Sequence, residues 1–234
     1  MQNKTSVLFR WIGLAVLLVL IPTVIFVGVK VFADRKYHII SIVIAFLSCV
    51  PFFLRFERSK AGVREIIIIA VMSAFSVIGR LIFAPLPGFK PVTAITVISG
   101  VALGPEAGFL VGSVSAIVSN IFFGQGPWTP FQMFVWGIIG FLAGIIFRGR
   151  IKPNRIGLCI FGAFSGVLFS AMMDIWTVLA VDGTWSWQRY AAAMVSAVPF
   201  MIVYVVSNVI FLLLLAKPFL EKIGRIKTKY GIEP

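Results

Sequence analysis

Long apolar segments alternate with short loops of charged, glycine and proline residues along the whole chain. Eight segments can be drawn, and most approach the length, about 17–25 residues, that an α-helix needs to cross a bilayer. They cover roughly residues 7–33, 37–54, 62–83, 92–103, 107–123, 130–147, 156–180 and 192–216. The pattern predicts an all-α integral membrane protein.

Two of these segments are short for a membrane span. Residues 92–103 offer only twelve positions before the turn Gly104-Pro105-Glu106, and the segment 107–123 is also short. An untilted helix of twelve residues does not cross about 30 Å of hydrocarbon. We therefore expect these two segments to be shortened, tilted or partly re-entrant, and to be sheltered by protein rather than by lipid.

The first segment has two interpretations. The first ten residues carry Lys4 and Arg10, and a basic start before a hydrophobic run is also found in signal peptides. The run is too long for a signal peptide, and no small-residue cleavage site closes it. We interpret it as a retained helix.

Composition agrees with a membrane protein. Hydrophobic residues make up 60% of the chain, charged residues 12%, and the mean hydropathy is +1.04. The net charge of +13 does not indicate nucleic-acid binding, because its carriers form short clusters between the apolar segments. Cys49 and Cys159 lie inside apolar segments without paired or metal-ligand spacing, so neither a disulfide nor a metal site is predicted.

The basic residues also predict an orientation. If alternate loops are assigned to opposite sides, one side, which includes both termini, carries 15 Lys and Arg residues and the other carries six. The positive-inside rule then places both termini in the cytoplasm. Loops 84–91, 124–129 and 181–190 face outward.

Tryptophan is concentrated towards the outward face. Only Trp11 lies on the inner side, which an evenly distributed interfacial belt does not explain. Both a belt and an aromatic ligand pocket remain open as interpretations. The tryptophans of the outward side are Trp128, Trp136, Trp176, Trp185 and Trp187.

A few polar residues lie inside apolar segments. Asp174 is one to two turns from the outer end of its segment, where a charge is costly unless it faces a cavity or a partner, and Arg80 is the candidate partner. Asp174 therefore either contacts a ligand or forms a structural pair. Asn120, Gln132 and Asn208 are equally open to two roles, ligand contact or hydrogen bonding between helices.

Small residues recur at a spacing of four. Ala70 and Ala74 would place two methyl groups on one face of their segment and let another helix approach closely. The same spacing occurs in two glycine series, for which internal packing is the default interpretation: Gly100, Gly104, Gly108 and Gly112, and Gly140 and Gly144.

Catalytic motifs are absent from the sequence. It has no phosphate-binding loop ending in Gly-Lys-Ser/Thr and no zinc-protease His-Glu pair, and its single histidine cannot complete the usual hydrolase sets. We therefore expect no enzyme activity and no cofactor of its own. The protein is either passive or driven by other subunits.

Three motifs carry a resemblance to a known family. They are Phe89-Lys90-Pro91-Val92-Thr93-Ala94, Gly104-Pro105-Glu106-Ala107-Gly108-Phe109 and Gly124-Gln125-Gly126-Pro127-Trp128-Thr129-Pro130-Phe131-Gln132-Met133. The chain resembles the membrane-embedded S components of energy-coupling factor (ECF) transporters, and within them the branch that includes cobalamin-binding members.

The resemblance implies an architecture and partners. Residues 61–220 would form the six-helix S-component core, preceded by two additional transmembrane helices in 1–60 and followed by a basic cytoplasmic tail in 221–234. An S component of a prokaryotic cell membrane binds a vitamin from outside and topples on a transmembrane coupling subunit driven by two ATPase subunits. The family's docking pattern maps onto Ala70 and Ala74, and its gating loop onto 84–91.

The resemblance and the tryptophan-rich outer face favour cobalamin as the ligand. Riboflavin, pantothenate, folate or a modified nucleobase would suit the same chemistry, because a shared fold does not choose the ligand. A stand-alone channel or scaffold protein is the alternative from another class. The residues expected to contact the substrate are Arg80, Lys90, Pro91, Trp128, Thr129, Gln132, Trp136, Asp174, Trp176 and Trp185.

Overall fold

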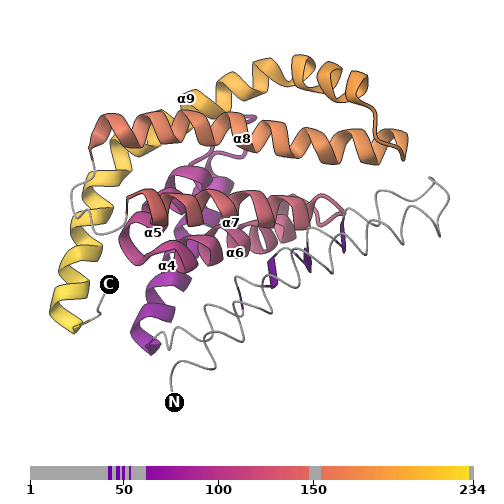
Figure 1. Ribbon diagram of the computed structural model, residues 1–234. Helices are drawn as coiled ribbons and strands as arrows, with labels where there is room; N and C mark the ends of the chain where they lie inside the picture. Colours follow the sequence, from indigo (N-terminus) through magenta and orange to yellow (C-terminus); the bar gives the residue numbers. More distant parts are fainter. Residues whose placement is uncertain are drawn as a thin grey trace.

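The computed structural model describes residues 62–147 and 154–231, with a few positions between 42 and 53 (Figure 1). The two transmembrane helices predicted for residues 1–60 fall almost wholly outside the described residues. The described ranges contain helices and no strand, which confirms the all-α class. The helices are α4 (Val63–Ile82), α5 (Val92–Leu103), α6 (Pro105–Phe123), α7 (Thr129–Ile146), α8 (Arg155–Asp182) and α9 (Trp187–Tyr230).

Five of these six helices are long and apolar enough to cross a membrane, α5 being the shorter exception. Their ends lie where turn-forming residues interrupt the apolar runs. Gly104, for example, adopts a φ of 102° between α5 and α6, and Pro105 then occupies the first turn of α6. The predicted bounds of α4 to α8 therefore agree with the structure to within about two residues.

Helix α9 is much longer than the predicted segment 192–216. It continues through most of the basic segment that the sequence assigned to a tail and ends at Tyr230. The reason is an apolar stripe at helical spacing, Phe219, Ile223 and Ile226, in which Ile223 is only 4% exposed. The basic residues between these positions lower the hydropathy of the segment without interrupting the stripe.

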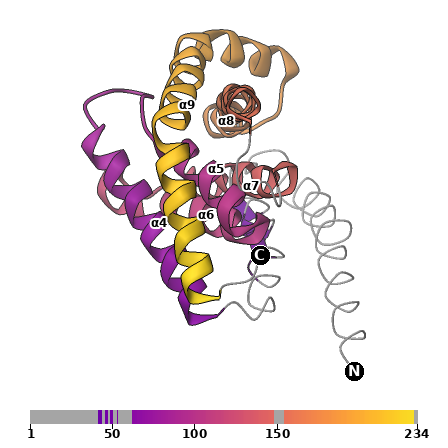
Figure 2. The same ribbon diagram turned by 90° about the vertical axis from the view of Figure 1, so that its left-hand side faces the viewer.

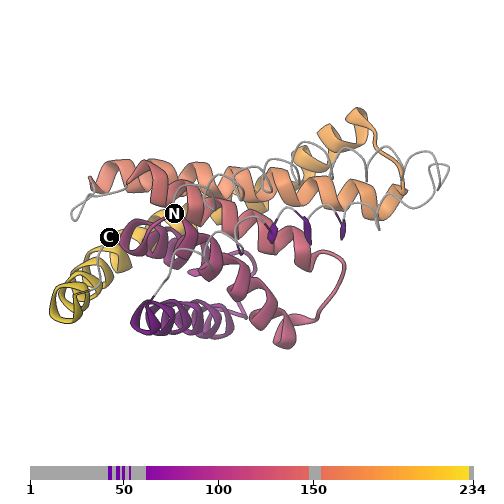
Figure 3. The same ribbon diagram turned by 60° about the horizontal axis from the view of Figure 1, so that its bottom comes forward.

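Helix α5 lies at the centre of the described fold. It packs against all five other helices, and every residue from Val92 to Gly100 is buried. Figure 3 shows α8 along one side of the molecule and α4 on the opposite side, with α5 to α7 between them, while α9 begins beside α8 and its last part reaches towards α4. The prediction that the short segment 92–103 is sheltered by protein is confirmed, whereas α6, at 19 residues, is long enough to span.

Glycines allow α5, α6 and α7 to pack with their backbones in contact. A Cβ atom at Gly100 or Gly108 would overlap the carbonyl of Gly140, and one at Gly144 would overlap the backbone of Pro105. This confirms internal packing as the role of both glycine series, except at Gly104, where a Cβ would meet nothing within 4 Å. The close contact fixes the positions of the helices around the site described next.

Candidate functional site

A cavity of about 120 Å³ lies beside the loop that joins α4 to α5. Five helices and this loop contribute to it, so side chains that are far apart in sequence meet at one end of the bundle. Its lining residues are Arg80, Gly88, Lys90, Val92, Thr93, Gln132, Trp136, Phe169, Tyr204 and Asn208.

Arg80, in the last turn of α4, is held by neutral oxygens. Its guanidinium donates hydrogen bonds to the hydroxyl of Ser119 and, over 2.8 Å, to Oδ1 of Asn120. The amide nitrogen of Asn120 in turn donates to Thr129 Oγ1 and to Gln132 Oε1, at 2.9 and 2.8 Å. The network joins α4, α6 and α7, so Asn120 does hold helices together while it also orients two groups at the cavity.

The loop beside the cavity is fastened to α9. The backbone nitrogen of Lys90 donates to Ser207 Oγ over 2.9 Å, and the same hydroxyl donates to the Lys90 carbonyl over 3.1 Å. Phe89 packs its ring 5.1 Å from that of Phe211, and Gly88, at a φ of 75°, lies against Tyr204. The segment that the resemblance assigns to a gate therefore depends on α9 for its position.

Aromatic rings form another part of the cavity lining. Trp136 stacks on Phe169, with a centroid distance of 5.1 Å and an interplanar angle of 17°, and Tyr204 contacts Phe169 edge-on at 5.3 Å. The guanidinium of Arg80 lies 5.1 Å from the Trp136 ring, within cation–π range. The site thus combines cationic and polar groups with flat apolar surfaces.

The structure brings some of the predicted site residues together and separates others. Arg80, Lys90, Gln132 and Trp136 line the cavity. Pro91 is buried at the start of α5, next to Val92 and Thr93 of the cavity lining. Thr129 accepts a hydrogen bond from Asn120, which also bonds to Arg80 and Gln132.

Three predicted tryptophans are not part of the cavity lining. Trp176 packs on Phe131 at 5.4 Å, and Trp185 joins a cluster with Trp187 and Tyr190. Trp128, which is 37% exposed, lies against Gly126. The interfacial-belt interpretation suits the exposed tryptophans, and the pocket interpretation suits Trp136 alone.

Sequence reasoning did not propose Thr93, Phe169 or Tyr204 as site residues. Phe169 and Tyr204 lie in continuous apolar segments, where nothing in the pattern separates a cavity-lining ring from a core ring. Thr93 is part of one of the family motifs, which was the only available signal. Asn208 lines the cavity and also donates to the Gly162 carbonyl over 3.1 Å, so it links α9 to α8.

Asp174 does not pair with Arg80 in the described part of the chain, contrary to one predicted alternative. Its Oδ2 atom is buried and has no hydrogen-bond partner. Asp174 is also not among the cavity-lining residues. The carboxylate therefore takes no part in the cavity lining or in the hydrogen bonds that hold Arg80.

This arrangement predicts the effect of neutralising Asp174. Because Oδ2 is buried without a partner, Asp174→Asn should not destabilise the protein, and should raise the free energy of unfolding by about 1 kcal/mol. Thermal unfolding of the purified variant measures the change. A clear loss of stability would show that a partner of the carboxylate holds the fold.

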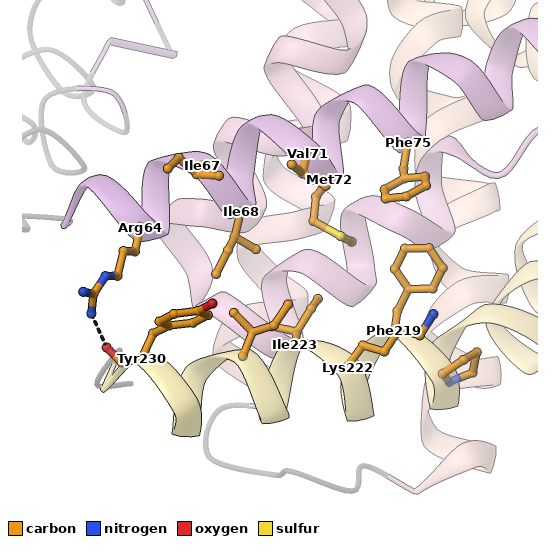
Figure 4. A pocket seen from close by; sticks show the side chains of 12 residues that line it. Arg64, Ile67, Ile68, Val71, Met72, Phe75, Phe219, Lys222, Ile223 and Tyr230 are labelled. Atoms are coloured by element: carbon orange, nitrogen blue, oxygen red, sulfur yellow. Dashed lines mark hydrogen bonds between the residues drawn. The ribbon is translucent and has the colours of Figure 1, made fainter.

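A second concave surface lies at the other end of the molecule, between α4 and the last part of α9. Figure 2 shows these two helices side by side, and Figure 4 shows the groove between them, with a volume of about 580 Å³. Phe75 contacts Phe219 at 5.5 Å, and Arg64 donates to the Tyr230 carbonyl over 2.7 Å. The other lining residues are mostly apolar, with Lys222 at the rim.

Ala70 and Ala74 lie on an exposed face of α4 that adjoins this groove. Both are exposed, as are the neighbouring apolar residues Ile67 and Val71 of the groove lining. In a membrane this face meets lipid or another helix, and its two methyl groups permit a close approach.

Comparison with known proteins found relatives that cover about half of the chain. A UPF0397 protein of Aliivibrio fischeri (strain MJ11) is 30% identical in an alignment of 128 residues, and the match covers 47% of this chain and 69% of the relative. A UPF0397 protein of Clostridium perfringens (strain SM101 / Type A) is 34% identical in an alignment of 105 residues, and this match covers 42% of this chain and 55% of the relative. The comparison with solved structures found no match.

The match to a protein family is more extensive. The model of the family described as "ECF-type riboflavin transporter, S component" matches residues 60–224, which include all six described helices except the last turns of α9. The matched range contains the residues that line the cavity, the loop that carries Lys90, and the exposed Ala70 and Ala74. The chain belongs to the family of ECF transporter S components, which are multi-pass subunits of prokaryotic membrane transporters.

Proposed function

We propose that the chain is the membrane-embedded, substrate-binding subunit of an ATP-driven ECF importer. It takes a micronutrient from the outer face into the cavity lined by Arg80 and Lys90, and delivers it by toppling on a transmembrane coupling subunit that two cytoplasmic ATPases drive. The observation that carries this proposal is the convergence of polar and aromatic side chains from five helices on one cavity. The family match supports the same role.

The identity of the ligand is a separate part of the proposal. Cobalamin is the ligand that the sequence resemblance favours, whereas the matched family is named for riboflavin. The cavity of about 120 Å³ is smaller than the roughly 300–1,000 Å³ of pockets that enclose drug-sized ligands. A complete vitamin would therefore enter only after the loop 83–91 moves, and cobalamin, the largest candidate, needs the greatest opening.

Binding of a micronutrient can be tested by thermal unfolding of the detergent-purified protein with cobalamin, riboflavin, pantothenate or folate. A ligand that binds only the folded state at a hundred times its Kd stabilises it by about 2.7 kcal/mol. We expect one of these compounds to raise the unfolding temperature in a concentration-dependent way. Absence of any effect, together with no ATPase subunit co-purifying from the native host, would favour a stand-alone channel or scaffold.

We also propose that both termini lie in the cytoplasm, from the distribution of basic residues. Thr184 and Thr228 provide a matched test because both are exposed and lie at opposite ends of α9. Thr184 lies just before the helix begins, and Thr228 lies in its last turn. In a background with Cys49 and Cys159 replaced by alanine, an impermeant maleimide added to intact cells should label Thr184→Cys and not Thr228→Cys.

Permeabilised cells supply the control for this experiment, because the maleimide should then label both Thr184→Cys and Thr228→Cys. Labelling of Thr228→Cys in intact cells, with Thr184→Cys protected, would reverse the orientation and place the cavity on the cytoplasmic side.

The coupling subunit is proposed to dock on the exposed face of α4 around Ala70 and Ala74. The apolar groove between α4 and α9 adjoins this face and would extend the contact towards the cytoplasmic end. Small side chains on α4 allow a partner helix to approach, and apolar residues on both sides of the groove would pack against it.

A further inference from the structure

Two cationic side chains converge on the cavity. Arg80 and Lys90 both line it, and both lie over the same aromatic ring, that of Phe123. The guanidinium carbon of Arg80 is 4.6 Å from the centroid of this ring, and Nζ of Lys90 is 4.7 Å from it. One phenyl ring therefore brings two positive charges close together.

No carboxylate neutralises these charges in residues 62–147 and 154–231. Arg80 donates only to the neutral oxygens of Ser119 and Asn120, and Nζ of Lys90 has no hydrogen-bond acceptor there. Asp174 does not line the cavity. Partial burial, and after it the charge of Arg80, lowers the pKa of Lys90, as expected for a cation near a like charge.

The cation–π contacts with Phe123 offset only part of the free-energy cost of placing the charges of Arg80 and Lys90 close together. An aromatic ring stabilises a nearby cation by much less than a buried counter-ion does, and two like charges at one site repel each other. Arg80 is 9% exposed, so water does not fully solvate its charge. An anion in the cavity would interact favourably with both groups at once.

From this geometry we infer that the cavity binds the carboxylate or phosphate group of an anionic micronutrient. The inference rests on the proposed function and specifies its substrate class. Arg80 and Lys90 hold the anionic group, and the stacked rings of Trp136 and Phe169 provide an apolar surface for the rest of the molecule. Among the candidates above, pantothenate and folate carry carboxylates, whereas riboflavin is neutral.

Matched pairs of compounds test the inference on the full-length protein. The pairs differ in the anionic group alone: pantothenate and panthenol, nicotinate and nicotinamide, biotin and biotin amide, and flavin mononucleotide and riboflavin. Thermal unfolding and isothermal titration should show that the anionic member of one pair binds and that its neutral partner binds at least about tenfold more weakly. Carboxylate and phosphate are distinguished by which pair responds.

Lys90→Gln is the informative variant, because Lys90 is held to Ser207 by its backbone nitrogen and carbonyl, which the substitution leaves in place. It should weaken binding of the anionic compound by about ten- to a hundredfold, and Lys90→Arg, which keeps the charge, should restore most of the affinity. Arg80→Gln should have a similar effect on affinity, but it also removes the hydrogen bonds to Ser119 and Asn120 and so does not test binding alone.

Arg225→Gln is the matched control. It removes one positive charge from an exposed position near the end of α9, outside the cavity, and should leave affinity unchanged. Equal binding of both members of the responding pair, or full affinity in Lys90→Gln, would overturn the anion inference while the proposed function stands. If no compound binds and the purified protein retains no small molecule, the proposed function falls and the inference falls with it.

Discussion

Replacing Ala70 and Ala74 together with tryptophan should abolish assembly with the coupling subunit and uptake of the ligand. Both alanines are exposed on α4, so two indole rings there would keep a partner helix from approaching. Ligand binding by the isolated chain should stay nearly intact, because neither residue lines the cavity. Co-purification with the ATPase subunits, uptake by cells and ligand titration measure the three quantities separately.

Ile160→Trp is the control for this experiment. Ile160 is 66% exposed on α8, away from the α4 face, so the variant adds bulk to a membrane-facing position without touching the proposed docking surface. It should assemble and transport normally. If the Ala70/Ala74 variant instead loses ligand binding and stability together with assembly, its face of α4 has a role in folding.

The largest loss of stability is expected for Gly140→Ala. A Cβ atom there would overlap the backbone carbonyl of Gly108 and come within 2.8 Å of Thr96 Cγ2. Backbone atoms cannot move aside as a flexible side chain can, so α6 and α7 would have to separate. We expect a loss of about 3 kcal/mol or more, seen as a lower unfolding temperature and a smaller folded fraction in size-exclusion chromatography.

Gly224→Ala provides a matched control in another helix. A Cβ at Gly224 would meet nothing within 4 Å, so alanine should stabilise α9 by about 0.5–1 kcal/mol through its better helix propensity. Similar unfolding temperatures for both variants would contradict the close backbone packing between α6 and α7.

The hydrophobic pattern predicted most of the fold because membrane spans differ strongly from loops in hydropathy. It also identified the short α5 as a protein-sheltered segment, since twelve residues are too few to span. The same pattern failed for the end of α9, where basic residues between Phe219, Ile223 and Ile226 reduce hydropathy while the apolar stripe continues. Only the packing of this stripe shows that the helix extends to Tyr230.

The site was predicted less completely. Arg80, Lys90, Gln132 and Trp136 were identified because polar and aromatic residues are unusual in their positions, and the structure places all four at one cavity. Phe169 and Tyr204 could not be identified in this way, since their role depends on where α8 and α9 pack.

The absence of an ion pair between Asp174 and Arg80 in the described residues could also be seen only in the structure. Both residues lie near the same end of their helices, which suggested an ion pair from sequence. Arg80 instead donates hydrogen bonds to Ser119 and Asn120 of α6, which are 39 and 40 residues away from it along the chain.

Small-molecule mass spectrometry of the protein purified from cells grown in a vitamin-rich medium tests the central claim most directly. An S component that binds its ligand tightly should retain one micronutrient in a one-to-one ratio, and the Lys90→Gln variant should retain much less of it. Purified protein that carries no micronutrient, and takes none up from a mixture of vitamins, would contradict the account.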